Sequence, residues 1–199
     1  KMQVFADASH SPVEAGTYYD KSRERHERDR KAKWGTLRDD QSRLKNVQRI
    51  PGQNIVPFED TKLIRFSSEN RANDRLAEYA IDGKPSTVWH SQFSQEKKKH
   101  PHELVIDLGQ TRMINGFYYL ARQDKGWNGA FGETEFYVSD KADHFPEGPY
   151  VRYHFQKEKQ AQRVEGAEIS CRYVLVRNIS EVAGNDFGSA ADIAVVLAR

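Results

Sequence analysis

One stretch decides the fold class of this 199-residue chain, His102-Glu103-Leu104-Val105-Ile106-Asp107-Leu108-Gly109. Its apolar side chains alternate, with Leu104, Ile106 and Leu108 at every second position. A period of two places these three side chains on one face of a β-strand, where they can meet a core. The glycine at the end of the run indicates a turn. The stretch therefore predicts a β-strand with one buried face.

Similar short runs, rich in apolar and aromatic residues, recur on both sides of this stretch. Turn residues separate them, for example Asn128-Gly129 and Pro146-Glu147-Gly148-Pro149. Many short strands joined by such turns are typical of an all-β fold, an antiparallel β-sandwich or jelly roll. We predict this fold for residues 61–199. The expected strands are 63–67, 103–108, 114–120, 135–138, 151–155, 173–176 and 193–196.

Residues 1–60 have a different composition. Charged residues dominate between positions 19 and 47, and opposite charges such as Glu24 and Arg28 stand four residues apart. Such pairs stabilise an exposed helix. We predict a charged, partly helical N-terminal extension or linker that ends near Ile50-Pro51-Gly52-Gln53. Acidic residues interleave with the basic ones, which favours a solvated helix over a surface that binds nucleic acid.

The composition bounds the partners of the chain. A hydrophobic fraction of 37% is enough for one core, and the 11% of aromatic residues favours strands and surfaces on which sugars stack. A net charge of +2 argues against nucleic acid or an anionic membrane as partner. One cysteine, Cys171, excludes a disulfide framework and is expected to be a buried thiol. No run is long and apolar enough to cross a membrane, and Lys1–Phe5 does not resemble a signal peptide.

Four blocks, in order along the chain, carry a resemblance to a known family. They are Ala80-Ile81-Asp82-Gly83-Lys84-Pro85-Ser86-Thr87-Val88-Trp89-His90-Ser91, His102–Gly109, Gly116-Phe117-Tyr118-Tyr119-Leu120-Ala121-Arg122-Gln123 and Ser189-Ala190-Ala191-Asp192-Ile193. Together they resemble the coagulation factor V/VIII type C, or discoidin, family. Within that family they are most similar to the bacterial family 32 carbohydrate-binding modules. The resemblance covers residues 61–199 and implies a galactose-binding-like β-sandwich that recognises glycans of the galactose type, galactose or N-acetylgalactosamine.

The first block contains hard oxygen donors next to a tight turn, which suits Ca²⁺. The resemblance implies one structural calcium held by the carbonyls of Tyr79 and Lys84, the side chains of Asp82 and Thr87, and the chain at Ala191 and Asp192. The family usually has Glu at the last of these positions, and with the shorter Asp we expect this contact to be mediated by water or lost. The alternative is a plain turn in which Asp82 accepts main-chain amides without a metal.

Sugar recognition needs an aromatic face and forked or planar polar groups. The resemblance implies that His90, Arg122, Asn128 and Phe187 supply them from loops at one end of the sandwich. Trp127, beside Asn128, is a further candidate for stacking, and its alternative role is to anchor the loop.

No nucleophile elbow, phosphate loop or zinc spacing occurs, so the sequence predicts a non-catalytic module. In the family that it resembles, catalysis belongs to a neighbouring domain of the same chain, and the setting is secreted, periplasmic or on the bacterial cell surface. Two rival functions are a membrane-binding discoidin domain with apolar loop residues (Trp127, Phe131 and Phe187) and a protein-interaction module that has lost its sugar site.

Overall fold

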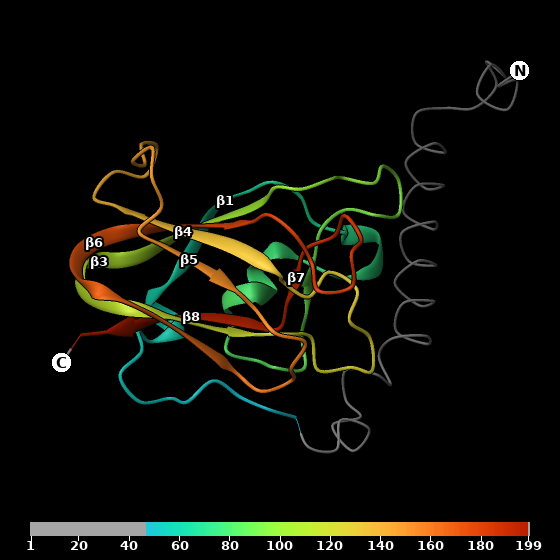
Figure 1. Cartoon of the computed structure of the whole chain (residues 1–199), viewed down its shortest axis with the longest axis horizontal. Coiled ribbons are helices and arrows are strands. Elements are labelled where there is room, and N and C mark those ends of the chain that lie inside the picture. The colour runs from blue at the N-terminus through green and yellow to red at the C-terminus, as the bar shows by residue number, and fades with distance from the viewer. Residues whose placement is uncertain (1–46, 199) are drawn as a thin grey trace, which may run out of the picture. The chain divides into compact units, whose positions relative to one another are not determined.

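The computed structural model describes residues 47–198. They form an antiparallel β-sandwich with a few short 3₁₀ helices (Figure 1), as the sequence predicts. Among these residues no helix is long and apolar enough to cross a membrane. The helix predicted near residues 20–47 lies outside the described part of the chain. The strands are β1 (Lys62–Phe66), β2 (Trp89–His90), β3 (His102–Leu120), β4 (Glu133–Ser139), β5 (Val151–His154), β6 (Gln162–Asn178), β7 (Ser189–Ala190) and β8 (Asp192–Leu197), and the 3₁₀ helices are η3 (Phe58–Asp60), η4 (Arg71–Asn73) and η5 (Ala77–Ile81).

The large sheet is built on two long strands, β3 and β6, which pair with each other along most of their length. The first part of β3 pairs with β1, and its second part pairs with β8. Strand β4 lies between β6 and β5, which completes the order β1-β3-β6-β4-β5. Figure 1 shows β3 and β6 bending over at one end of the sandwich, so that each strand contributes to both layers.

The predicted break after residue 108 is wrong, because 103–108 and 114–120 are two parts of the single strand β3. Gly109 has a φ of +76° and Gly116 a φ of +143°, and the pairing register shifts close to both. Glycine adopts these angles without the clash that a Cβ atom brings. The chain therefore bends at the glycines and continues as a strand, where the sequence suggested a turn.

The core fills the space between the layers. Leu104, Ile106 and Leu108 from the first part of β3 are buried in one cluster with Phe117 and Tyr119 from its second part. The alternation in the sequence thus marks the core face correctly. Aromatic rings stack within this cluster: the centroids of Phe117 and Phe136 are 4.3 Å apart, and those of Tyr119 and Phe131 are 4.5 Å apart.

The sandwich includes residues that precede position 61. Ile55 forms an isolated β-bridge with Val196, and the amide of Val56 donates to the carbonyl of Val195 at 2.8 Å. The side chain of Val56 is buried in the core. The predicted domain boundary at residue 60 therefore lies inside the compact unit. Two apolar residues at 55–56 are too short a run to predict a strand from the sequence.

Two very short strands, which the sequence analysis missed, position the candidate site. Strands β2 and β7 pair so that Trp89 lies opposite Ala190, and His90 lies opposite Ser189. Isolated bridges link Ala130 to Ser189 and Phe131 to Glu181. The segments that follow β3, β6 and η5 are thereby held together at one end of the sandwich.

Candidate functional site

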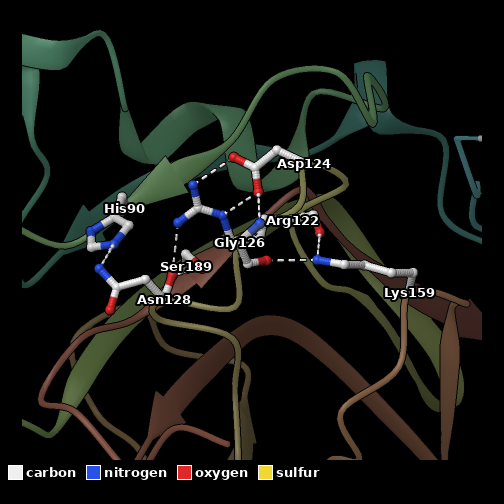
Figure 2. Close-up of polar contacts among 7 residues, drawn as sticks. All are labelled: His90, Arg122, Asp124, Gly126, Asn128, Lys159 and Ser189. Atoms are coloured by element: carbon white, nitrogen blue, oxygen red, sulfur yellow. Dashed lines mark hydrogen bonds and ion pairs between the residues drawn. The ribbon is translucent and has the colours of Figure 1, made fainter. Parts of the chain in front are cut away.

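Four side chains predicted to bind sugar lie together at this end of the sandwich, three of them drawn in Figure 2. His90 is on β2, Arg122 and Asn128 are on the loop after β3, and Phe187 precedes β7. Asn128 Nδ2 lies 3.5 Å from His90 Nε2, and Arg122 donates to the main-chain oxygen of Asn128 at 2.9 Å. The centroids of the His90 and Phe187 rings are 5.3 Å apart. The fold therefore joins positions that are almost 100 residues apart in the sequence.

His90 presents a neutral imidazole with a defined tautomer. Its side chain is buried, and burial is the main reason why its pKa falls to about 4, with smaller contributions from the charges of Arg122 and Arg75. Its Nδ1 lies 2.8 Å from the main-chain oxygen of Ser91, so Nδ1 carries the proton and donates it. The other nitrogen, Nε2, is then a hydrogen-bond acceptor that faces the site.

Arg122 forms a forked ion pair with Asp124, which the sequence analysis did not single out. Nε donates to Oδ1 at 2.7 Å, and a terminal nitrogen donates to Oδ2 at 2.6 Å (Figure 2). The Arg122 side chain is only 14% exposed. A third N–H donates to the Asn128 carbonyl, so three of the five guanidinium donors have partners within residues 47–198. The geometry leaves two donors for a ligand.

The Asn128 loop is held by buried polar contacts. The Asn128 carbonyl accepts a second hydrogen bond, from Ser189 Oγ at 3.0 Å. The buried carboxylate of Glu181 accepts from the amide of Gly129 and, at 3.0 Å, from the amide of Asn185. These contacts tie the loop after β3 to the loop after β6, so the Asn128 amide group is preorganised.

An aromatic wall stands beside His90. Phe93 lies with its ring centroid 4.7 Å from that of His90, in an edge-to-face arrangement, and 6.2 Å from that of Phe187. Phe93 is 40% exposed. Phe93 was not predicted as a site residue, although a phenylalanine within the polar run Ser91–Lys99 is a signal for one. Phe93 and Phe187 together offer apolar surface next to the acceptor of His90.

Trp127 is in the same loop but has a different environment. Its ring packs against the core, and Lys159 Nζ lies 3.8 Å from the ring centroid. The same ammonium group donates to the carbonyls of Arg122 and Gly126, each at 2.7 Å. This arrangement agrees with the loop-anchor alternative, since a lysine occupies one face of the indole.

The predicted metal ligands gather at the loop between η5 and β2. Asp82 Oδ1 accepts from the amide of Lys84 at 2.9 Å, and the Thr87 hydroxyl oxygen lies 3.0 and 2.9 Å from the two Asp82 oxygens and 2.7 Å from the Lys84 carbonyl, to one of which it donates. From β8, Asp192 Oδ1 accepts from the amide of Gly83 at 2.9 Å. Tyr79 lies in η5, and Ala191 joins β7 to β8. The short Asp192 side chain thus does reach the loop.

The charge of Asp82 in this loop acts on Asp192 of β8. Asp192 is buried, and burial first, then the charge of Asp82, raises its pKa to about 8. Burial also raises the pKa of Asp82. Two converging carboxylates and nearby carbonyls are a donor set of the kind that a hard cation takes. Within residues 47–198 no group of three or more His, Cys, Asp or Glu side chains is placed to hold a metal, so carbonyl oxygens would have to complete the shell.

Comparisons with known proteins agree with this architecture. The family model of the F5/8 type C domain matches residues 64–193. A sialidase of Micromonospora viridifaciens is 31% identical over 130 residues, which are 65% of this chain and 20% of the sialidase. The chain thus corresponds to about a fifth of that relative.

Solved structures similar to this chain include carbohydrate-binding modules of Clostridium perfringens. CpGH89CBM32-5, solved in complex with GalNAc-β-1,3-galactose, is 26% identical with a TM-score of 0.64, over 71% of this chain and 99% of that one. The family 32 module of NanJ, solved in complex with galactose, is 21% identical with a TM-score of 0.60, over 71% and 97%. The second likeness bears on the fold alone. The match of the family model and the observed sandwich show that this chain belongs to the F5/8 type C domain family.

Proposed function

We propose that this chain is a non-catalytic carbohydrate-binding module that recognises galactose-type glycans at His90, Arg122, Asn128 and Phe187. The observation that carries the proposal is the neutral His90, whose acceptor Nε2 has one long contact within residues 47–198, with Asn128 Nδ2 at 3.5 Å, and which lies near Arg122 with its two remaining donors. A galactose-type sugar has an axial hydroxyl at carbon 4. That hydroxyl can donate to the imidazole while it and its neighbour accept from the guanidinium.

The aromatic wall supports the same proposal. The carbon–hydrogen face of a galactose ring is apolar on the side opposite the axial hydroxyl, and it packs well on an aromatic surface. Phe187 and the exposed Phe93 border the polar groups and offer such a surface. The similar modules of Clostridium perfringens, solved in complex with GalNAc-β-1,3-galactose and with galactose, support a galactose-type sugar as the ligand proposed for this chain.

The rival membrane function has less support. It calls for apolar side chains that project from the loops. Of the three candidates, Phe131 is buried in the core, and the ring of Trp127 is packed against the core beneath Lys159. The remaining one, Phe187, belongs to the wall beside His90.

The module is proposed to serve a larger carbohydrate-active protein. The sialidase relative is about five times longer than the region that it shares with this chain. A module of this kind would hold a catalytic domain of the same chain on its substrate, and it would act in a secreted, periplasmic or cell-surface protein.

We also propose that Asp82 and Asp192 bind a structural Ca²⁺, together with the Thr87 side chain, the Tyr79 and Lys84 carbonyls and the chain at Ala191. The raised pKa values of Asp82 and Asp192 support this proposal: burial raises both, the charge of Asp82 raises that of Asp192 further, and a bound cation would stabilise both groups in their charged form. The ion would fasten the η5 loop to β8 and take no part in sugar chemistry.

Titration calorimetry with galactose-terminated oligosaccharides tests the sugar proposal. Loss of a charged donor costs about 1.5–3 kcal/mol, so Arg122→Ala should weaken binding by roughly 10- to 100-fold. Because this change also leaves Asp124 without its partner, Arg122→Lys is the companion variant, which retains a charge for Asp124 but loses the fork. Melting curves of both variants show whether the fold is intact.

Lys98→Ala is the matched control. Lys98 is exposed and pairs with Glu96, and no contact joins it to the site within the described residues. It should bind like the wild type. Equal affinity of the wild type and a folded Arg122→Ala protein would move the binding site elsewhere, and a glycan array dominated by sugars other than galactose or N-acetylgalactosamine would refute the sugar class.

A further inference from the structure

An arginine outside the predicted site lies directly against it. Arg75 follows η4, and its carbonyl accepts from the amide of His90 at 3.4 Å and from the amide of Asn70 at 3.3 Å. Asn70 and Arg75 also form an isolated β-bridge. The preceding residue, Asp74, has a left-handed φ of +55°, which redirects the chain just before Arg75. Arg75 is therefore fixed at its main chain to the strand that carries His90.

The charge of Arg75 affects the pKa values of the site residues. The pKa of Arg75 is lowered, first by burial and then by the charge of Arg122. In turn Arg75 contributes to the lowered pKa of His90 and, together with Arg122, to the lowered pKa of Asp124. Two guanidinium groups thus share the neighbourhood of one carboxylate, whose two oxygens are both bonded to Arg122.

Arg75 has no side-chain partner within residues 47–198, where neither a hydrogen bond nor an ion pair reaches its guanidinium. This distinguishes it from the other half-buried arginines of the described chain. Each of those donates to an oxygen of another side chain: Arg112 to Asp60, Arg122 to Asp124, Arg163 to Asn115, Arg172 to Asp107 and Arg177 to Glu103. A half-buried cation next to a second cation loses hydration, and the nearby charges of Asp124 and Asp74 offset this loss only in part, since the pKa of Arg75 is still lowered. An anion from outside the chain would offset the remainder.

We propose that Arg75 binds an anionic group, a carboxylate or a sulfate ester, on the galactose-type sugar that His90 and Arg122 hold. This inference rests on the proposed function and makes it more specific, since the favoured ligand is then an acidic sugar. The guanidinium plane offers paired donors that match the oxygens of a carboxylate or a sulfate. Arg122 is already neutralised by Asp124, so Arg75 is the cation that remains for the ligand.

Calorimetric titration with three methyl glycosides tests the inference: the galactoside, the galacturonide with its carboxylate, and the galactoside 6-sulfate. Charge-assisted hydrogen bonds are the stronger kind, so the wild type should bind at least one acidic sugar about tenfold or more tightly than the neutral one. The better of the two acidic sugars identifies the anionic group. Raised salt should reduce the preference, because dissolved ions screen the attraction between Arg75 and the anionic group.

The variants separate recognition from folding. Arg75→Gln should bind the acidic sugars no better than the neutral one, and Arg75→Lys, which retains the charge, should keep part of the preference. The matched control is Arg71→Gln, four residues away, whose side chain is 78% exposed and pairs with Glu69 at 2.5 Å. It should retain the full preference.

Two results would overturn the inference: equal affinity of the wild type for all three sugars, or a preference that survives in folded Arg75→Gln. Both leave the proposed function standing, as long as the neutral galactoside binds and Arg122→Ala weakens its binding. If none of the three sugars binds the wild type, the proposed function fails, and the inference fails with it.

Discussion

Protonation of His90 should destabilise the fold in mild acid. The imidazole is buried, its Nδ1–H bonds the Ser91 carbonyl, and the charges of Arg122 and Arg75 oppose a further positive charge. These causes lower its pKa from 6.5 to about 4 in the folded state. The unfolded chain therefore binds more protons than the folded chain between these two pKa values. The free energy of unfolding must therefore fall as the pH is lowered from 6.5 towards 4. Above the unfolded pKa, His90 is neutral in both states and this loss of stability is absent.

The size of the effect follows from the two pKa values. At about pH 5 the unfolded imidazole is almost fully protonated, while the folded one is still mostly neutral. Linkage then gives a loss of about 2 kcal/mol in the free energy of unfolding between about pH 7 and pH 5. Sugar binding should change little over the same range, because folded His90 retains its neutral form.

Urea unfolding at both pH values, followed by tryptophan fluorescence, measures this loss. His102 also has a pKa lowered by burial, and the raised pKa of Asp192 acts with the opposite sign. The informative quantity is therefore the difference between the wild type and His90→Asn, which should be less sensitive to acid by about 2 kcal/mol. His144→Asn, which removes an exposed histidine, serves as the control. If the wild type and His90→Asn lose the same stability between the two pH values, the argument from the buried neutral imidazole is refuted.

Two further predictions concern stability. Gly116→Ala should lower the free energy of unfolding in urea by more than about 2 kcal/mol, because Gly116 has a φ of +143° and a Cβ atom there would collide with the Val164 carbonyl. Gly148→Ala, with open space around the added Cβ, is the control and should be nearly neutral. Equal stability of the two variants would contradict this prediction. Removal of calcium with a chelator should lower the melting temperature of the wild type but not that of Asp82→Asn, since only a bound ion adds stability by mass action. An unchanged wild-type melting temperature would mean that the loop is a plain turn.

Within the described chain, much of the fold could be predicted from local patterns. The alternation of Leu104, Ile106 and Leu108 identified the core face of β3, because the side-chain period of a strand is local geometry. Where the prediction failed, the deciding factor was long-range. Gly109 reads as a turn in isolation, but pairing with β6 on either side of it keeps the chain in one bent strand. Ile55 and Val56 join the sandwich only because β8 offers them partners.

The candidate site divides in the same way. His90, Arg122, Asn128 and Phe187 can be predicted as site residues from the sequence alone, because the motifs of the family occur there in order. The neutral tautomer of His90, the pairing of Arg122 with Asp124, the exposed Phe93 and the unpartnered Arg75 follow from no local pattern. Burial, hydrogen bonding and charge are properties of groups that the pairing of β2 with β7 brings together, from segments almost 100 residues apart. The sequence by itself determined the β-sandwich, the family and the chemical groups, and only the tertiary structure decided which of those groups are neutral, paired or left for a ligand, because protonation and pairing depend on neighbours in space.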